Sequence, residues 1–244
     1  MASYQPAVGD DGSGRTIYMH IEPGLVTGAK IALSVVTAGG AAALTAKHAW
    51  DSIRETNIAS FTARSALAMI AVFVFFQILP HHAVGVSEVH FIFGSTLFLL
   101  LGAAPAAIGL ALGLLVQGLL FAQIDLPQYG MNVTTLLVPL FAMKVVADRI
   151  IAPGTAYADV SYKQALALST TYQAGVVAWV GFWVTYGQGF GSEVLASVGT
   201  FGAAYILVIA AEPLLDLAVL AGAKAIKKPL TDTGLAAPRL FKAA

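Results

Sequence analysis

Long apolar stretches, separated by short polar segments, run through most of the sequence. Few or no charged residues interrupt the ranges 26–46, 65–79, 89–124, 126–143, 164–192 and 194–222. A helix that crosses the hydrocarbon core of a bilayer needs about 20 apolar residues, because all its peptide groups must be hydrogen-bonded within the segment. The range 89–124 is nearly twice that long and is interrupted by Gly-Ala-Ala-Pro at 102–105, so we interpret it as two helices joined by a tight turn. The pattern predicts an all-α polytopic membrane protein with about seven transmembrane helices.

Lysine and arginine are unevenly distributed over the connections between these stretches. Alternate connections carry Lys47, Arg54, Arg64, Lys144, Arg149, Lys163, Lys224, Lys227, Lys228, Arg239 and Lys242. The other connections, at 80–88, 125–132 and 187–193, contain neither residue type. Cytoplasmic loops of membrane proteins collect Lys and Arg. We therefore predict an N-terminus outside and a cytoplasmic C-terminus, in a plasma membrane such as the bacterial inner membrane.

Composition and charge narrow the possible functions. The chain is 58% hydrophobic, and its 13 basic residues balance 13 acidic ones, so we expect the lipid bilayer and not nucleic acid as a partner. It has no cysteine, so any metal ligand must be nitrogen, oxygen or thioether. It also lacks a His-Glu-x-x-His motif, a phosphate-binding Gly-rich loop with lysine and a Gly-x-Ser-x-Gly motif. We expect a transport protein and not an enzyme.

The chain is predicted to divide into three parts. Residues 1–18 are polar, with a Gly-Asp-Asp-Gly-Ser-Gly cluster, and we expect a disordered leader that reflects a misassigned translation start. Residues 19–222 form a single transmembrane domain. Residues 223–244 form a basic cytoplasmic tail.

Four of the five histidines fall at the predicted outer ends of the first three spans. These are His20, His81, His82 and His90, whereas His48 lies on the inner side. Imidazole is the commonest nitrogen ligand of first-row transition metals, so we predict a metal site open to the outside. The alternative is that they are ordinary amphipathic residues at the headgroup interface.

Several short motifs resemble those of one family of membrane permeases. They are Met19-His20-Ile21 followed by Pro23-Gly24, Glu88-Val89-His90 followed by Gly94-Ser95-Thr96, the stretch 109–120 with Gln117, and Gly130-Met131-Asn132. From Met19 to about Gly222 the sequence resembles the cobalt and nickel permeases of energy-coupling-factor (ECF) ABC transporters, the CbiM/NikM type. The resemblance implies a subunit that captures divalent metal at the extracytoplasmic face. Co²⁺ or Ni²⁺ would be the transported substrate, and no bound organic cofactor is expected.

The resemblance also implies a set of metal ligands. Met19 would supply its N-terminal amine, His20 its backbone nitrogen and imidazole, and His90 a second imidazole. Four nitrogens in a plane favour Ni²⁺ or Co²⁺.

An amine ligand at Met19 requires that residues 1–18 be absent, because the nitrogen of Met19 is otherwise part of a peptide bond. Three alternatives therefore stay open. Translation starts at Met19, or the leader is removed, or one of His81, His82 and Glu88 replaces the amine.

Two further pairs of residues are expected to have a structural or functional role. We expect Met131 and Asn132 to hold or roof the loop that presents the first two ligands, with an ordinary turn as the alternative. Glu212 and Asp216 are four residues apart on one helix face. Carboxylates at membrane depth usually have a partner, so we expect them to pair with a basic residue near the inner surface, with a proton or ion path as the alternative.

The resemblance implies partner proteins that the sequence itself does not contain. They are a transmembrane scaffold (T) subunit, two cytosolic ATPase subunits that hydrolyse ATP and, often, a small accessory membrane subunit. Ala42 and Ala46, four apart on one face of the first span, are placed to seat a partner helix. Packing within the chain is the alternative.

Two other functions are weighed against metal capture. One is a vitamin-type or copper-binding substrate subunit of the same kind of transporter. The other is an ancillary subunit of a membrane redox or haem complex, with His20, His81 or His90 as an axial ligand. Haem ligands usually face one another across a bundle, whereas these histidines are predicted to gather at one surface.

Overall fold

The computed structural model describes residue 21 and residues 24–242. The predicted leader and two of the predicted ligands, Met19 and His20, lie outside the described residues. The elements are η1 (Gly28–Ile31), α1 (Ala32–Glu55), α2 (Ile58–Gln77), β1 (His82–Val84), β2 (Ser87–Val89), α3 (Gly94–Leu101), α4 (Ala103–Leu120), η2 (Gln123–Gln128), α5 (Tyr129–Ile150), η3 (Tyr157–Asp159), α6 (Tyr162–Gln188), α7 (Ser192–Ala225), α8 (Lys227–Asp232) and η4 (Pro238–Leu240), where η marks a 3-10 helix.

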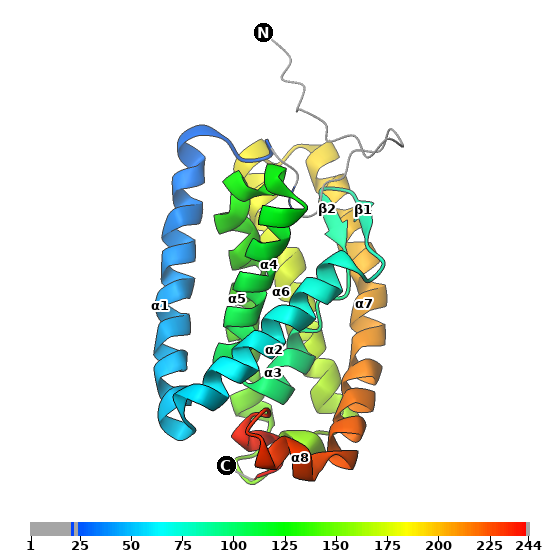
Figure 1. Cartoon of the computed structure of the whole chain (residues 1–244). Helices are drawn as coiled ribbons and strands as arrows, with labels where there is room; N and C mark the ends of the chain where they lie inside the picture. Colours follow the sequence, from blue (N-terminus) through cyan, green and yellow to red (C-terminus); the bar gives the residue numbers. More distant parts are fainter. Residues whose placement is uncertain (1–20, 22–23, 243–244) are drawn as a thin grey trace.

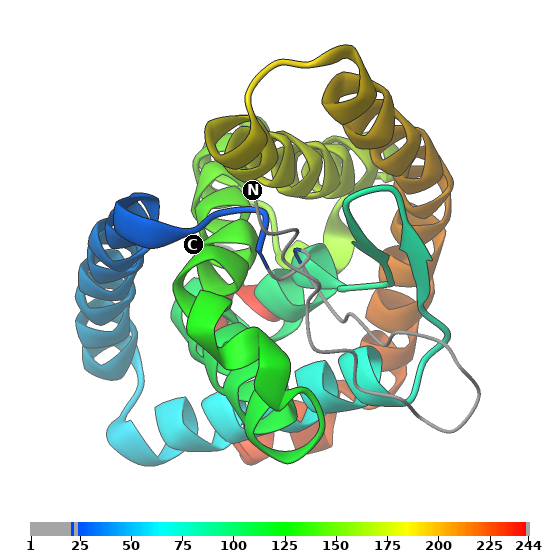
Figure 2. The ribbon, with the colours of Figure 1, turned by 90° about the horizontal axis from the view of Figure 1, so that it is seen from above.

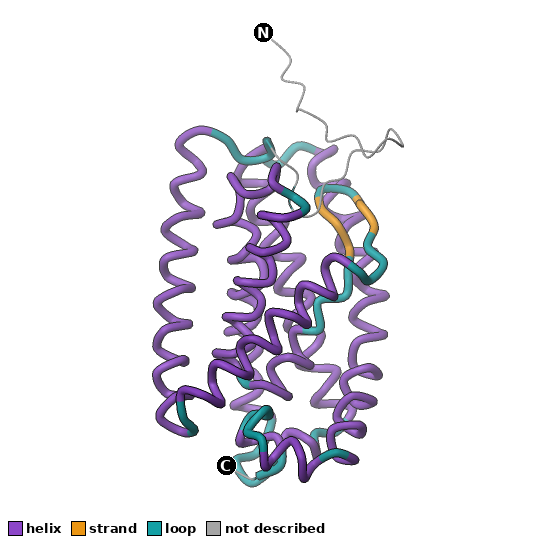
Figure 3. Tube along the Cα trace, viewed as in Figure 1, coloured by secondary structure: helices purple, strands orange, loops and turns teal. Residues whose placement is uncertain are grey.

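These helices form an up-and-down bundle with two distinct ends (Figure 1). The β1–β2 hairpin and the start of α1 lie at one end, which we call the hairpin end. The end of α7, α8 and the C-terminus lie at the other, which we call the C-terminal end. Outside the short hairpin, the described residues are helical or in loops (Figure 3).

Five segments of the described residues contain helices long and apolar enough to cross a membrane. They are Gly28–Glu55, Ile58–Gln77, Ala103–Leu120, Gln123–Ile150 and Ser192–Ala225. The predicted all-α polytopic architecture is thereby confirmed. Helix α6 has 27 residues, enough in length, but polar residues that turn inward, such as Ser169 and Gln173, lower its apolar character.

The expectation that the first of the two helices in 89–124 spans the membrane from Val89 is wrong. Val89 ends strand β2, and α3 has only 8 residues, about 12 Å of helix, which is too short to cross a bilayer. A loop of residues 90–93 links the strand to α3. The turn predicted near residues 102–105 is present, since α3 ends at Leu101 and α4 begins at Ala103.

Small residues allow α2 and α4 to pack closely. A Cβ atom at Gly109 would overlap Ala68, and one at Gly113 would meet Val72. Helices in membranes approach most closely where such residues face each other. Helix α1 instead lies at the edge of the bundle (Figure 2), and its residues Ala42 and Ala46 are exposed.

The described part of the predicted tail folds back on the C-terminal end. Helix α7 continues to Ala225, beyond the expected boundary. After α8, the backbone N–H of Ala237 donates to Leu100 O at 2.7 Å, and Leu240 is fully buried. These contacts attach the tail to α3.

Candidate metal centre

A small cavity at the hairpin end brings together residues from five parts of the chain. It is lined by Ile21, Ser87, Glu88, His90, Ile92, Asn132, Thr135, Leu136, Val176, Val180, Phe201 and Tyr205. Its volume of about 20 Å³ is little more than the 10–15 Å³ that one water molecule requires on the same kind of measure. The cavity can therefore hold a water molecule or a single ion, but no organic ligand.

His90 is held in the wall of this cavity. The residue is 6% exposed, and its ring stacks on Phe76 at the end of α2, with centroids 4.8 Å apart and planes inclined by 26°. Its backbone is hydrogen-bonded to the Tyr205 side chain of α7. The imidazole therefore has few alternative orientations.

Glu88 also lines the cavity, two residues before His90. Its side chain is buried, and Oε2 has no hydrogen-bond partner among the described residues. Burial, and after it the nearby Asp125 carboxylate, raises the pKa of Glu88 to about 8. The cavity thus offers one imidazole and one carboxyl group.

Asn132, on the first turn of α5, links the cavity to the N-terminal segment. Its Oδ1 accepts a hydrogen bond from the backbone N–H of Ile21 at 3.4 Å, across 111 residues of sequence. Both residues are buried. The residue that precedes Ile21 in the sequence is His20.

The same N-terminal segment is fastened to the end of α6. Gln188 Nε2 donates to Leu25 O at 2.9 Å, and Lys30 Nζ donates to the carbonyl oxygens of Tyr186 at 2.8 Å and Gly187 at 3.1 Å. A Cβ atom at Gly187 would overlap Leu25, so only glycine allows this close approach. Leu25 and Lys30 are therefore held against the end of α6.

Three other predicted site residues do not reach the cavity. His81 is half-buried, and its Nδ1 lies 3.1 Å from Leu79 O. His82 is exposed on β1, and Met131 is buried in the core. Among the described residues no group of three or more His, Cys, Asp or Glu side chains is arranged to hold a metal ion.

The expected ion pairing of Glu212 and Asp216 is wrong. Both carboxylates are fully buried in α7, and neither forms an ion pair among the described residues. Glu212 instead accepts hydrogen bonds from the backbone of Ile92 and Phe93, which follow His90. Sequence reasoning missed this role, because it counted side-chain charges and not backbone N–H groups as partners.

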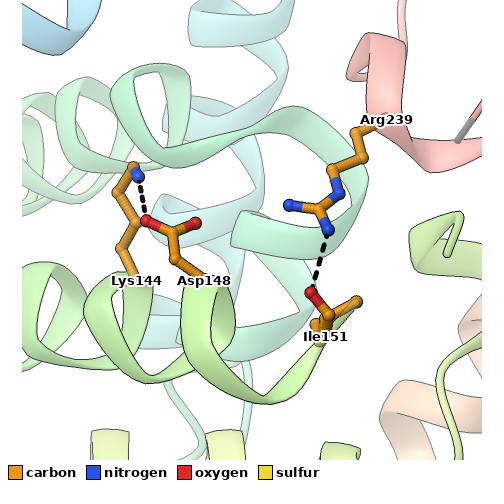
Figure 4. Close-up of polar contacts among 4 residues, drawn as sticks. All are labelled: Lys144, Asp148, Ile151 and Arg239. Atoms are coloured by element: carbon orange, nitrogen blue, oxygen red, sulfur yellow. Dashed lines mark hydrogen bonds and ion pairs between the residues drawn. The ribbon is translucent and has the colours of Figure 1, made fainter. Parts of the chain in front are cut away.

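The C-terminal end has a cavity of different character. Its volume is about 530 Å³, and it is lined by His48, Asp51, Ser52, Glu55, Arg64, Phe98, Gly102, Ala103, Ala104, Lys144, Asp148, Tyr157, Ala237, Pro238, Arg239 and Lys242. Figure 4 shows two contacts there: Lys144 Nζ lies 2.6 Å from Asp148 Oδ2, and Arg239 donates to Ile151 O at 3.2 Å. The lining carries charges of both signs, and no three of its described His, Asp and Glu side chains are grouped to hold a metal ion.

Comparison with known proteins gives one match. A family model described as CbiM, cobalt uptake substrate-specific transmembrane region, matches residues 20–230. No curated protein and no solved structure matches the chain. The matched range begins at His20 and includes every residue that lines the small cavity.

Proposed function

Because the chain belongs to the CbiM family of substrate-specific transmembrane regions for cobalt uptake, we propose that it is the metal-capturing subunit of an ECF transporter. It is a multi-pass membrane protein that acts in transport, with Co²⁺ as substrate. Ni²⁺ is included in the proposal because four nitrogen ligands suit both ions.

In this proposal the hairpin end faces away from the cytoplasm. Eleven of the 13 lysine and arginine residues belong to the ranges 47–64, 144–163 and 224–242, which contribute to the C-terminal end. Cytoplasmic loops of membrane proteins carry an excess of Lys and Arg, so this distribution supports the proposed orientation. Metal would then enter from the extracytoplasmic side, next to the small cavity.

The proposed ligands are His90, His20 and Met19. One observation carries the assignment: Asn132 holds the backbone nitrogen of Ile21 in the wall of the cavity that His90 also lines. Because His20 is bonded to that nitrogen in the chain, this contact supports a site at which the two motifs meet. Glu88 is the proposed additional ligand or neighbour of the ligands.

The size of the small cavity favours an ion over the alternative substrates. Sites for organic ligands typically measure about 300–1,000 Å³. At about 20 Å³, the cavity beside His90 is far below that range. The small volume therefore supports a single ion over a vitamin or a haem group at this site.

Partner subunits complete the proposal. A T subunit, two cytosolic ATPase subunits and a small accessory membrane subunit would couple capture to ATP hydrolysis. Helix α1 supports this, because it lies at the edge of the bundle with Ala42 and Ala46 exposed. Small residues on an uncovered face permit close contact with a partner helix.

Calorimetric titration of purified protein with Co²⁺ and with Ni²⁺ tests the proposal. We expect the form that begins at Met19 to bind one ion, and His90→Ala to weaken binding about 100-fold or more, since it loses a direct ligand. His48→Ala is the matched control, because His48 lines the cavity at the other end. Equal affinity of His90→Ala and the unmodified protein would overturn the proposal.

A further inference from the structure

One face of α7 holds the whole segment that runs from His90 into α3. Tyr205, Glu212 and Asp216 are seven and four residues apart, a spacing that places them on the same side of a helix. All three are buried, with at most 1% of their surface exposed. Each is hydrogen-bonded to the segment 90–96.

Glu212 makes the central contacts of this face. Its Oε1 accepts from the backbone N–H groups of Ile92 at 3.3 Å and Phe93 at 3.0 Å. Its Oε2 accepts from Gln173 Nε2 at 2.6 Å and Ser169 Oγ at 3.3 Å, both on α6. Four donors from two elements thus fix the carboxylate, and the carboxylate fixes the loop.

The loop needs such a partner because its conformation is unfavourable. Phe93 has a φ of +54°, the left-handed region that side chains with a Cβ rarely adopt. The N–H groups at 92 and 93 lie in a buried part of the protein, where an amide without an acceptor is costly. Asp216 continues the attachment by accepting from Ser95 Oγ at 2.7 Å and from the hydroxyl of Thr96.

We propose that Glu212 is a positioning residue for metal capture, which fixes the His90 loop by accepting hydrogen bonds from two of its backbone amides. The inference rests on the proposed function, in which His90 is a ligand. Only one residue separates His90 from the first of these amides, so a shift of the loop moves the imidazole out of the cavity wall. Residues that orient a metal ligand typically change metal affinity 10–100-fold when they are replaced.

The test compares three substitutions in α7 by titration with Co²⁺. We expect Glu212→Ala to weaken binding about 10–100-fold without changing the number of sites per molecule. Glu212→Gln keeps the acceptor oxygen, and Gln173, whose Oε1 has no partner among the described residues, can turn its amide to meet the new N–H₂ group. That variant should bind almost as the unmodified protein does. Glu193→Ala, an exposed carboxylate of the same helix, is the control and should change nothing.

The number of sites separates positioning from a general loss of fold. If Glu212 only stabilised the bundle, Glu212→Ala would reduce the fraction of binding-competent molecules and leave the affinity of the rest unchanged. Such a result would overturn the inference, and so would a loss of binding in Glu212→Gln equal to that in Glu212→Ala. Should Glu212→Ala fail to purify as a single species, Glu212→Asp serves instead, because its shorter side chain withdraws the acceptor.

Hydrogen exchange of the metal-free protein provides a readout that does not depend on the proposed function. We expect the amides of Ile92 and Phe93 to exchange at least about tenfold faster in Glu212→Ala than in the unmodified protein or in Glu212→Gln. Unchanged exchange at these two amides would contradict the positioning role, whatever the Co²⁺ titration shows. If His90→Ala retains full affinity, the proposed function fails, whatever the exchange rates show.

Discussion

The two ends of the bundle bury polar groups for different purposes. At the hairpin end, a cavity of about 20 Å³ lies beside a loop whose backbone amides are held by the buried Glu212. At the C-terminal end, a cavity of about 530 Å³ is lined by charges of both signs. The two ends therefore differ in the volume of their cavities and in the charge of the side chains that line them.

Arg64 and Glu212 illustrate the difference. Arg64, 1% exposed, donates to Leu101 O at 2.8 Å and to Ser52 Oγ and Thr56 Oγ1 at 3.1 Å, so it joins α1, α2 and α3. Glu212 holds backbone amides next to a predicted ligand. The first charge joins three helices, whereas we propose that the second also determines where a metal ligand lies.

The largest effect on stability is expected for a substitution of Arg64, at the C-terminal end. Arg64→Ala leaves Leu101 O and two hydroxyl groups without their donor, so we expect the free energy of unfolding to fall by about 2–4 kcal/mol. Co²⁺ affinity of the folded protein should not change. Thermal unfolding in detergent and titration measure the two quantities, with the exposed Arg54→Ala as control. A weakened Co²⁺ affinity would show that the two ends are not independent.

A smaller effect is expected at Asn132, on the hairpin side. Asn132→Ala removes the acceptor of the Ile21 N–H, so the N-terminal segment loses its buried attachment. We expect Co²⁺ affinity to fall about tenfold and stability to change little. Gln188→Ala, which removes an exposed attachment of the same segment, should have a weaker effect. Equal affinities for Asn132→Ala and unmodified protein would contradict the convergence of the two motifs.

The smallest effect is expected for an exposed ion pair of the C-terminal end. Lys224 Nζ lies 2.7 Å from Asp159 Oδ1, but both side chains are about half exposed or more. Exposed pairs contribute about 0–1 kcal/mol. Asp159→Asn should therefore leave both Tm and Co²⁺ affinity almost unchanged. A large loss of either would show that this exposed ion pair contributes more to the C-terminal end than its exposure indicates.

The long helices could be predicted from sequence because apolar runs of 20 residues have few alternatives in a membrane. The path of residues 89–93 could not be predicted from the sequence. Except for His90 these residues are apolar, yet they do not form a helix, and the amides of Ile92 and Phe93 donate to Glu212, more than 110 residues later. A contact so distant in sequence leaves no local signal.

Only part of the candidate site could be predicted from the sequence. His90 and Asn132 stand in recognisable motifs, and both line the small cavity. His81 and His82 are candidates only because they are histidines near a span end, and neither lines the cavity. Tyr205 belongs to a motif-free part of α7, so nothing in the sequence indicated its contact with the His90 backbone.

Anomalous diffraction at the cobalt absorption edge, from crystals grown with Co²⁺, tests the central claim most directly. The account predicts a single strong peak at the hairpin end, about 2 Å from an imidazole nitrogen of His90. A peak beside His48 in the cavity of the C-terminal end, or at His81 and His82 away from His90, would contradict it.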